Sequence, residues 1–183
     1  MLQFSDPYIK LATTADRFAI INLLNKAYRG ESSKQGWTTE ANLIAGDQRT
    51  DEANLLQVMN QPGSVFLKYS SDEQLITGCV NLQQHGDRIY LGMFSVSPQE
   101  QGRGIGKHML KAAEEYALHL HCKAIYMSVI SVRHELIKWY QRHGYCDTGE
   151  RKPFIEDGLT GKHLQPLEFM ILEKSLSPGT STK

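Results

Sequence analysis

Three glycines at alternate positions, Gly102, Gly104 and Gly106, separate a β-rich run that ends at Val96 from a long amphipathic helix that begins near Ile105. Glycine has no Cβ atom, so it adopts backbone conformations closed to other residues and lets a ligand approach the main chain. At the start of a helix, free peptide N–H groups and the helix dipole attract an anion. Three alternating glycines exceed what a connecting turn requires, so the sequence predicts a phosphate-binding turn.

Two common phosphate-binding motifs do not fit this turn. A nucleoside-triphosphate P-loop would need glycine where Gln101 stands and serine or threonine where His108 stands. A dinucleotide-binding fingerprint would need glycine in place of Lys107, and antiparallel hairpins upstream do not suit it. Arg103 and Lys107 flank the turn and are candidates for charge-assisted contacts to phosphate.

The order of predicted elements indicates an α/β fold with a mixed sheet. Apolar and β-branched runs predict strands at residues 9–12, 65–69, 75–82, 88–96, 123–129 and 168–172, and helical periodicity or capping residues predict helices near 14–27, 38–45, 50–59, 105–120 and 133–143. Short connectors between the strands before residue 96 predict antiparallel hairpins, whereas the later strand–helix–strand order predicts a parallel step. We therefore expect one domain over residues 1–176, with helices flanking the sheet and a disordered polar tail at 177–183.

Composition excludes several functional classes. The chain has 183 residues, with 20 basic and 20 acidic side chains, so no global field attracts nucleic acid or an anionic membrane. The three cysteines, Cys79, Cys122 and Cys146, are odd in number and lack close pairs, which indicates a reducing, cytoplasmic location; Cys146 is expected to be a small buried residue. No signal peptide, membrane span or metal-ligand spacing is present, so we expect no membrane partner and no metal.

Two ordered motifs resemble the GNAT superfamily of N-acetyltransferases. One comprises Gln101, Gly104 and Gly106, and the other is Tyr140, three residues and then Gly144-Tyr145. The resemblance is specific over about residues 88–149 and extends in element order over about 9–172. It implies a GNAT-like fold, acetyl-CoA as the acyl donor, and a primary amine of a small molecule or peptide as the acceptor.

The resemblance also implies positions for the coenzyme. The main chain of one strand would pair with pantetheine, the peptide N–H groups of the turn would bind the pyrophosphate, and Tyr140 would lie beside the thioester sulfur. The residues concerned are Phe94, Ser95 and Val96 for pantetheine, and Gln101, Gly102, Arg103, Gly104, Ile105, Gly106 and Lys107 for the turn. Arg133 stands where many relatives carry a coenzyme-contacting asparagine, so it is included as a candidate contact in its place.

Catalysis requires an acid and a route for the amine proton. A lysine-like amine has a pKa of about 10.4, so its neutral form is scarce near neutral pH and its proton must be accepted. A phenol with a pKa near 10 can protonate the departing thiolate, whose pKa is near 8.5. We therefore expect Tyr140 to be the acid. Glu40 is the first candidate base, with Glu31, Tyr90 (where some relatives carry a glutamate base) and water left open.

The remaining expectations concern the acceptor and alternative functions. Trp37, Arg49, Phe154 and Glu156 are candidates for the acceptor pocket. A non-catalytic acyl-CoA sensor would need the same phosphate-binding turn but not Tyr140, so the sequence favours an enzyme over a sensor. A nucleic-acid binder is disfavoured by the balanced charge. A homodimer could form through an edge strand, for which the last β-rich run is a candidate.

Overall fold

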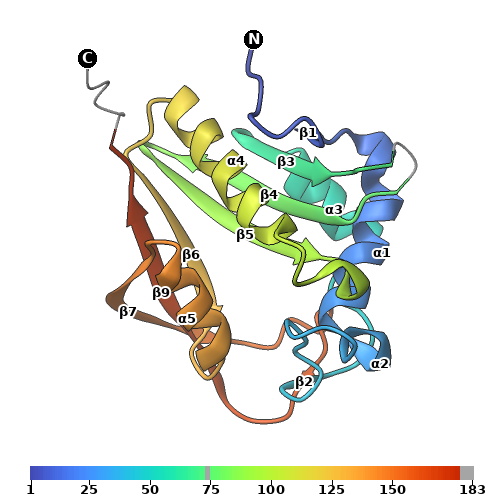
Figure 1. The fold of residues 1–183 in the computed structure, drawn as a ribbon. Helices are drawn as coiled ribbons and strands as arrows, with labels where there is room; N and C mark the ends of the chain where they lie inside the picture. The colour runs from blue at the N-terminus through green and yellow to red at the C-terminus, as the bar shows by residue number, and fades with distance from the viewer. Residues whose placement is uncertain (73–74, 178–183) are drawn as a thin grey trace.

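Seven strands form a central twisted sheet in the spatial order β1-β3-β4-β5-β6-β9-β7 (Figure 1). The computed structural model describes residues 1–72 and 75–177. The strands of this sheet are β1 (Ile9–Leu11), β3 (Ser64–Tyr69), β4 (Gly78–His85), β5 (Arg88–Val96), β6 (Ala124–Ile130), β7 (Cys146–Phe154) and β9 (Leu167–Ser175). Two further strands, β2 (Ile44–Ala45) and β8 (Lys162–His163), form a separate antiparallel pair.

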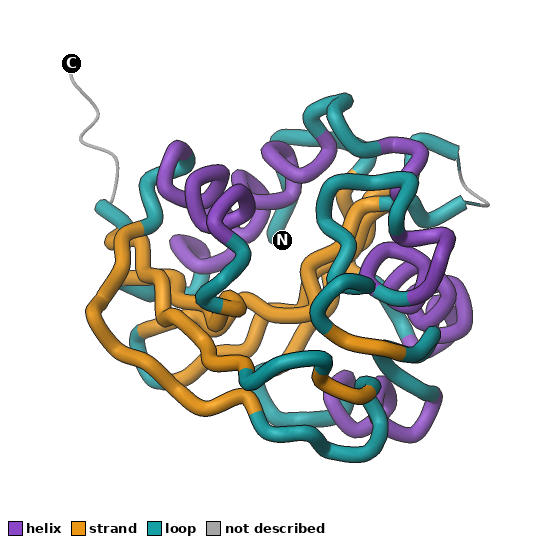
Figure 2. Tube along the Cα trace, turned by 90° about the horizontal axis from the view of Figure 1, so that it is seen from below, coloured by secondary structure: helices purple, strands orange, loops and turns teal. Residues whose placement is uncertain are grey.

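Helices lie on both sides of the sheet (Figure 2). They are α1 (Arg17–Tyr28), α2 (Gly30–Ser33), α3 (Glu52–Met59), α4 (Ile105–His119) and α5 (His134–Arg142), with short 3-10 turns at Thr14–Asp16 and Pro98–Glu100. Their ends follow local chemistry. Thr13 and Asp16 form a capping box before α1, and the carboxylate of Asp51 accepts the N–H of Asn54 at 2.8 Å to begin α3.

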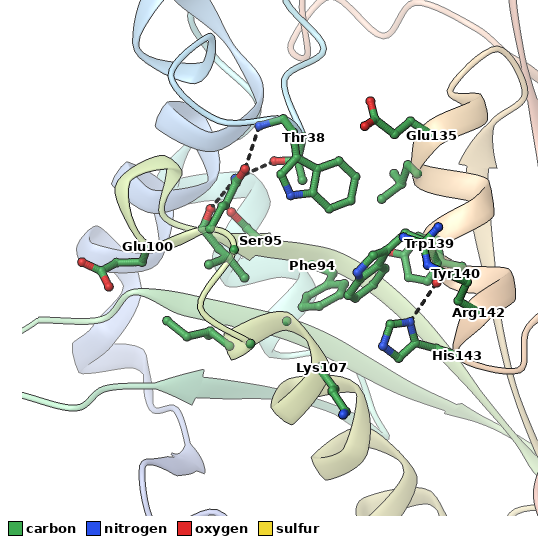
Figure 3. A pocket seen from close by; sticks show the side chains of 18 of the residues that line it. Thr38, Phe94, Ser95, Glu100, Lys107, Glu135, Trp139, Tyr140, Arg142 and His143 are labelled. Carbon is green, nitrogen blue, oxygen red and sulfur yellow. Dashed lines mark hydrogen bonds between the residues drawn. The ribbon is translucent and has the colours of Figure 1, made fainter.

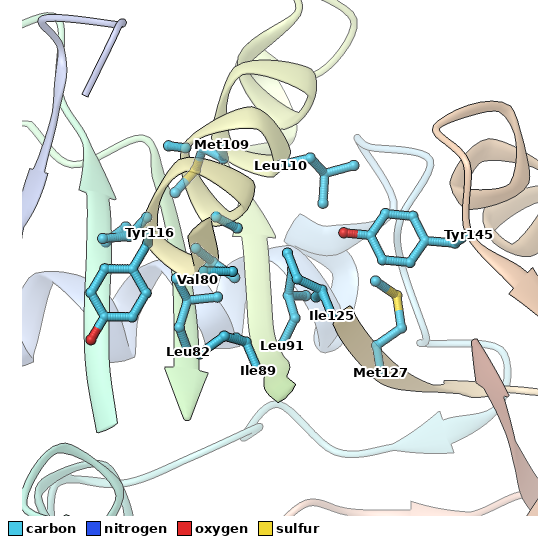
Figure 4. Packing of buried hydrophobic residues seen from close by; sticks show 14 of the residues in the cluster. Val80, Leu82, Ile89, Leu91, Met109, Leu110, Tyr116, Ile125, Met127 and Tyr145 are labelled. Carbon is cyan, nitrogen blue, oxygen red and sulfur yellow. The ribbon is translucent and has the colours of Figure 1, made fainter. Parts of the chain in front are cut away.

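The main hydrophobic core lies between α4 and the sheet. One face of α4 presents Met109 and Tyr116, which pack over Val80 and Leu91 of two central strands (Figure 4). Ile105 of the same helix belongs to this core cluster. Alternation along each strand places Cys79 on the opposite face, where α1 and α3 cover a second core. Burial of one large apolar side chain contributes about 1.5–3 kcal/mol, so these two layers hold the strand-to-helix turn after β5 in place.

The predicted hairpins and the parallel step are confirmed. Strands β1, β3, β4 and β5 pair antiparallel, whereas β5 and β6 are parallel. The parallel pairing joins only Arg88–Tyr90 to the residues Ala124, Ile125 and Tyr126, and the two strands then diverge (Figure 1). The second half of β5 therefore has no strand partner on its β6 side, while its other side stays paired with β4.

The predicted helix at residues 38–45 is wrong. The segment forms turns that lead into β2, because the Thr39 hydroxyl accepts the N–H of Ala41 at 3.1 Å and contacts the Ser33 hydroxyl at 2.6 Å. Threonine side chains that bind nearby main chain compete with helix formation. The preceding polar stretch, expected to be a loop, contains the short helix α2.

Two expectations about the end of the chain are also corrected. Strand β7 was not predicted, because its sequence lacks apolar alternation and contains Gly149 and Pro153; such a strand is tolerated at a sheet edge. The last β-rich run is β9, which lies between β6 and β7 and so offers no edge for a dimer. The predicted disorder of residues 177–183 lies outside the described residues, apart from Ser177.

Candidate active site

A cavity of about 620 Å³ lies between the glycine-rich turn, the end of β5 and helix α5 (Figure 3). This volume is within the range of small-molecule and cofactor sites. Nine of the predicted coenzyme residues line it, namely Phe94, Ser95, Val96, Gln101, Gly102, Gly104, Ile105, Gly106 and Lys107. Arg103 and Arg133 are not among the lining residues. The two predicted motifs therefore meet in space, because Tyr140 on α5 lines the same cavity.

The turn exposes main chain at the start of α4. Gly102 and Gly104 have φ angles of 83° and 85°, in the left-handed region that favours glycine. A Cβ atom built on either glycine meets nothing within 4 Å, so the backbone conformation and not steric crowding requires glycine here. Gly104 provides no side-chain cap for α4. The first N–H groups of this helix are consequently suited to bind an anion.

Gln101 ties the turn to a distant loop. Its amide nitrogen donates to the hydroxyl of Thr38 at 2.8 Å and to the carbonyl of Val96 at 3.0 Å, and its oxygen accepts the N–H of Trp37 at 2.8 Å. The Gln101 side chain therefore holds together three other residues of the cavity wall. Arg103 is exposed and pairs with Glu100 at 3.1 Å.

The middle of β5 carries a bulge beside the cavity. Pairing with β4 shifts register between Cys79 and Asn81, and Met93 has a φ angle of 45°. Such bulges bend a strand and redirect its groups. The carbonyl of Phe94 accepts a hydrogen bond from the hydroxyl of Tyr28 at the end of α1. The Ser95 hydroxyl is buried and has no hydrogen-bond partner in the described part of the chain.

Tyr140 lies where two cavities meet. A second cavity of about 110 Å³ shares Tyr28, Phe94, Leu136 and Tyr140 with the first. Tyr140 is 5% exposed and packs against Trp139, with ring centroids 5.2 Å apart. Burial raises its pKa well above the usual value of a phenol, with a further increase from neighbouring Tyr28. The side chain is therefore protonated across the neutral pH range.

Glu40 is held by two arginines. One carboxylate oxygen binds Arg29 at 2.7 Å and the other binds Arg133 at 3.2 Å. Arg133 also donates to the carbonyl of Thr38 at 2.6 Å. Both Glu40 and Arg133 line the second cavity, so Arg133 lies on the side away from the glycine-rich turn. Both carboxylate oxygens of Glu40 are therefore engaged by guanidinium groups.

The other candidates divide between the two cavities and the surface. Trp37 lines the first cavity, and Arg49 and Phe154 line the second. Three residues line neither cavity: Glu156 accepts the N–H of His163 at 2.6 Å, Glu31 pairs with Lys34 on the surface, and Tyr90 packs against Tyr126. Cys146, expected to be buried, is exposed on the edge strand β7.

A family model described as the acetyltransferase (GNAT) family matches residues 19–145, which is more than half of the chain. The chain belongs to this family. A spermine/spermidine N(1)-acetyltransferase from Bacillus subtilis (strain 168) is 39% identical over 64 residues, or 34% of this chain and 42% of the relative. The matched part thus spans about two-fifths of the curated relative's length.

Solved structures share the GNAT fold over almost the whole chain. The ribosomal-protein-S18-alanine N-acetyltransferase from Escherichia coli has a TM-score of 0.69 at 12% identity and covers 96% of this chain and 97% of its own. The yncA protein of Salmonella typhimurium, solved with its cofactor acetyl-CoA, has a TM-score of 0.67 at 18% identity, with 98% and 99% covered. At such identities the likeness concerns the fold.

The GNAT site contains residues that sequence reasoning missed. Tyr28 continues the apolar spacing of α1 and therefore looks like a core residue. Trp139 and His143 line the first cavity, with ring centroids 4.4 Å apart, and the Nδ1 of His143 lies 2.8 Å from the carbonyl of Trp139 (Figure 3). Their four-residue spacing, from α5 to the residue that follows it, was the available signal.

Within residues 1–72 and 75–177, no group of three or more His, Cys, Asp or Glu side chains is arranged to hold a metal ion. No helix in the same part is long and apolar enough to cross a membrane.

Proposed function

We propose that this protein is an acetyl-CoA-dependent N-acetyltransferase that transfers an acetyl group directly to a primary amine within a ternary complex. The observation that carries the proposal is the meeting of two cavities at Tyr140, one bordered by the glycine-rich turn and the other by Glu40 and Arg133. A donor and an acceptor entering from opposite sides would meet at this point. The balanced charge and the free cysteines fit a cytoplasmic enzyme.

The coenzyme supplies an acetyl thioester, and the chain supplies its binding site. The exposed N–H groups at residues 102–107 bind the pyrophosphate, with Lys107 contributing positive charge at the cavity wall. The main chain of Phe94, Ser95 and Val96 lies where β5 has left β6, and it pairs with the amides of pantetheine as a strand would. Arg133 is assigned to the acceptor side instead.

Tyr140 acts as the general acid. As the amine forms its bond to the acetyl carbon, the carbon–sulfur bond breaks and the phenol gives its proton to the departing sulfur. The amine proton leaves to a water molecule in the second cavity, whose volume of about 110 Å³ accommodates several waters. Glu40 is a positioning residue, since its two oxygens fix Arg29 and Arg133.

The test compares two buried tyrosines of the same region. Tyr140 and Tyr145 have ring centroids 5.8 Å apart, but only Tyr140 is among the residues that line the two cavities. Tyr140→Phe should lower kcat about 100-fold or more with little change in calorimetric affinity for coenzyme A, whereas Tyr145→Phe should keep kcat. The assay is release of free thiol from acetyl-CoA with a panel of amines.

Two results would reject the proposal. Equal turnover in Tyr140→Phe and the unmodified protein would remove the acid from the mechanism. Coenzyme binding without thiol release across the whole panel would instead identify a sensor of acyl-CoA.

A further inference from the structure

The second cavity has an unusual charge balance. Arg49 and Arg133 line it, and Glu40 is the one acidic side chain among its lining residues. Arg29, which is 1% exposed, pairs with the same carboxylate from behind. Two guanidinium groups, those of Arg29 and Arg133, therefore pair with one carboxylate, and Arg49 adds a third guanidinium to the cavity wall. A guanidinium does not lose its proton in proteins, so these four side chains together carry a net charge of +2.

The existing contacts do not neutralise this excess. Both oxygens of Glu40 are used by Arg29 and Arg133, and Arg29 Nη2 is buried without a hydrogen-bond partner among the described residues. Arg49 is anchored through its main chain, whose N–H donates to the side chain of Asn25 at 2.6 Å. Within residues 1–72 and 75–177, the Arg49 side chain forms no ion pair.

These charges act at the point where the two cavities meet. Burial raises the pKa of Tyr28 far above that of a free phenol, Glu40 adds to the increase, and Arg133 and Arg49 oppose it. Both arginines are thus close enough to Tyr28 to influence it. An anionic group in the second cavity would lie near them while its molecule reaches toward Tyr140.

We propose that the second cavity binds the acceptor through a carboxylate, held by Arg49 with support from Arg133, so that the enzyme prefers amines bearing this anionic group over polyamines. A guanidinium offers parallel N–H donors that match a carboxylate. A polyamine would need carboxylates, and the one in this lining is already engaged on both oxygens. The volume of about 110 Å³ corresponds to a few water molecules, which suits a small acidic head group.

This inference rests on the proposed function and narrows its substrate class. The test pairs amines that differ by one carboxylate: lysine with cadaverine, and methionine with 3-(methylthio)propylamine. The readout is kcat/KM for thiol release from acetyl-CoA. The acid of each pair should be preferred by about 10- to 100-fold, the range expected for charge-assisted hydrogen bonds.

Variants locate the effect. Arg49→Gln should bring the ratio within each pair close to one, and Arg49→Lys should keep part of the preference. Arg17→Gln removes the same charge from a surface pair with Glu52 and should leave the ratio unchanged. A purely structural role of Arg49 would lower activity toward both amines alike, so an unchanged ratio in Arg49→Gln would overturn the proposal.

Failure of this inference differs from failure of the proposed function. If cadaverine is used as well as lysine or better, the anion site is rejected but N-acetyltransferase activity stands. If no amine releases thiol, calorimetric titration of lysine and cadaverine with coenzyme A present decides the anion site by itself. Tighter binding of lysine supports it, and equal or absent binding rejects it.

Discussion

The two sides of the candidate active site are built from different parts of the chain. The glycine-rich turn presents exposed main chain from consecutive residues, and its geometry depends on the positive φ angles of Gly102 and Gly104. The second cavity depends on buried side chains, Arg29, Glu40 and Arg133, contributed by separate segments. The first region should therefore be sensitive to backbone conformation, and the second to charge.

In the cluster of Arg29, Glu40 and Arg133, we expect Glu40→Gln to cause the largest loss of stability. The amide can accept from one arginine but turns its NH₂ group toward the other, leaving a buried guanidinium without an anion. Removing one partner of a buried ion pair costs about 3–5 kcal/mol, and we expect a loss of this size in the free energy of unfolding. Urea denaturation measures it.

The matched control for that variant is Glu31→Gln. Glu31 pairs with Lys34 at 2.6 Å, but its side chain is 89% exposed. Exposed pairs contribute less than about 1 kcal/mol. Equal losses in the two variants would contradict the assignment of Glu40 to a buried, charge-dependent cluster.

Gly104→Ala tests whether the glycine-rich turn depends on its backbone conformation. A residue with a Cβ atom loses about 1–2 kcal/mol in the left-handed conformation, so the turn should rearrange and the Kd for coenzyme A should rise about 5- to 30-fold. Gly149→Ala is the control, because Gly149 also has a φ angle of 85° and open space around its Cβ position, yet lies on the edge strand β7. Calorimetry should show unchanged affinity in Gly149→Ala.

This contrast explains how much the sequence could predict. The turn and its flanking elements were predicted because their determinants are local; the strand at 88–96 coincides with β5. The ion pairs of Glu40 were not predicted, because its partners are 11 and 93 residues away in the chain. The helix expected at 38–45 failed for a local reason, because the Thr39 hydroxyl binds the N–H of Ala41, whereas the contacts of Gln101 with Trp37 and Thr38 span more than 60 residues.

Gln101→Ala tests whether the glycine-rich turn holds the loop that contains Trp37 and Thr38 in place. The variant loses its three hydrogen bonds to Trp37, Thr38 and Val96, but water replaces part of them, so we expect a loss of about 1 kcal/mol in stability. Hydrogen exchange at the Trp37 amide should accelerate. Gln99→Ala, which loses exposed contacts to Gln35 and Ser97, serves as the control. Unchanged exchange at Trp37 in Gln101→Ala would mean that the loop is held by other contacts.

The smallest effect is expected at alkaline pH. Burial raises the pKa of both Tyr140 and Tyr145 above the phenol value of about 10. Above that pH the unfolded chain loses these protons while the folded chain keeps them, so the unfolded state binds fewer protons and stability falls as pH rises. Either tyrosine-to-phenylalanine variant should lessen this fall in denaturation curves recorded between pH 9 and about 11. Only Tyr140→Phe should also lower kcat. An equal loss of kcat in both variants would show that the packing of these tyrosines limits the reaction, and not proton donation by Tyr140.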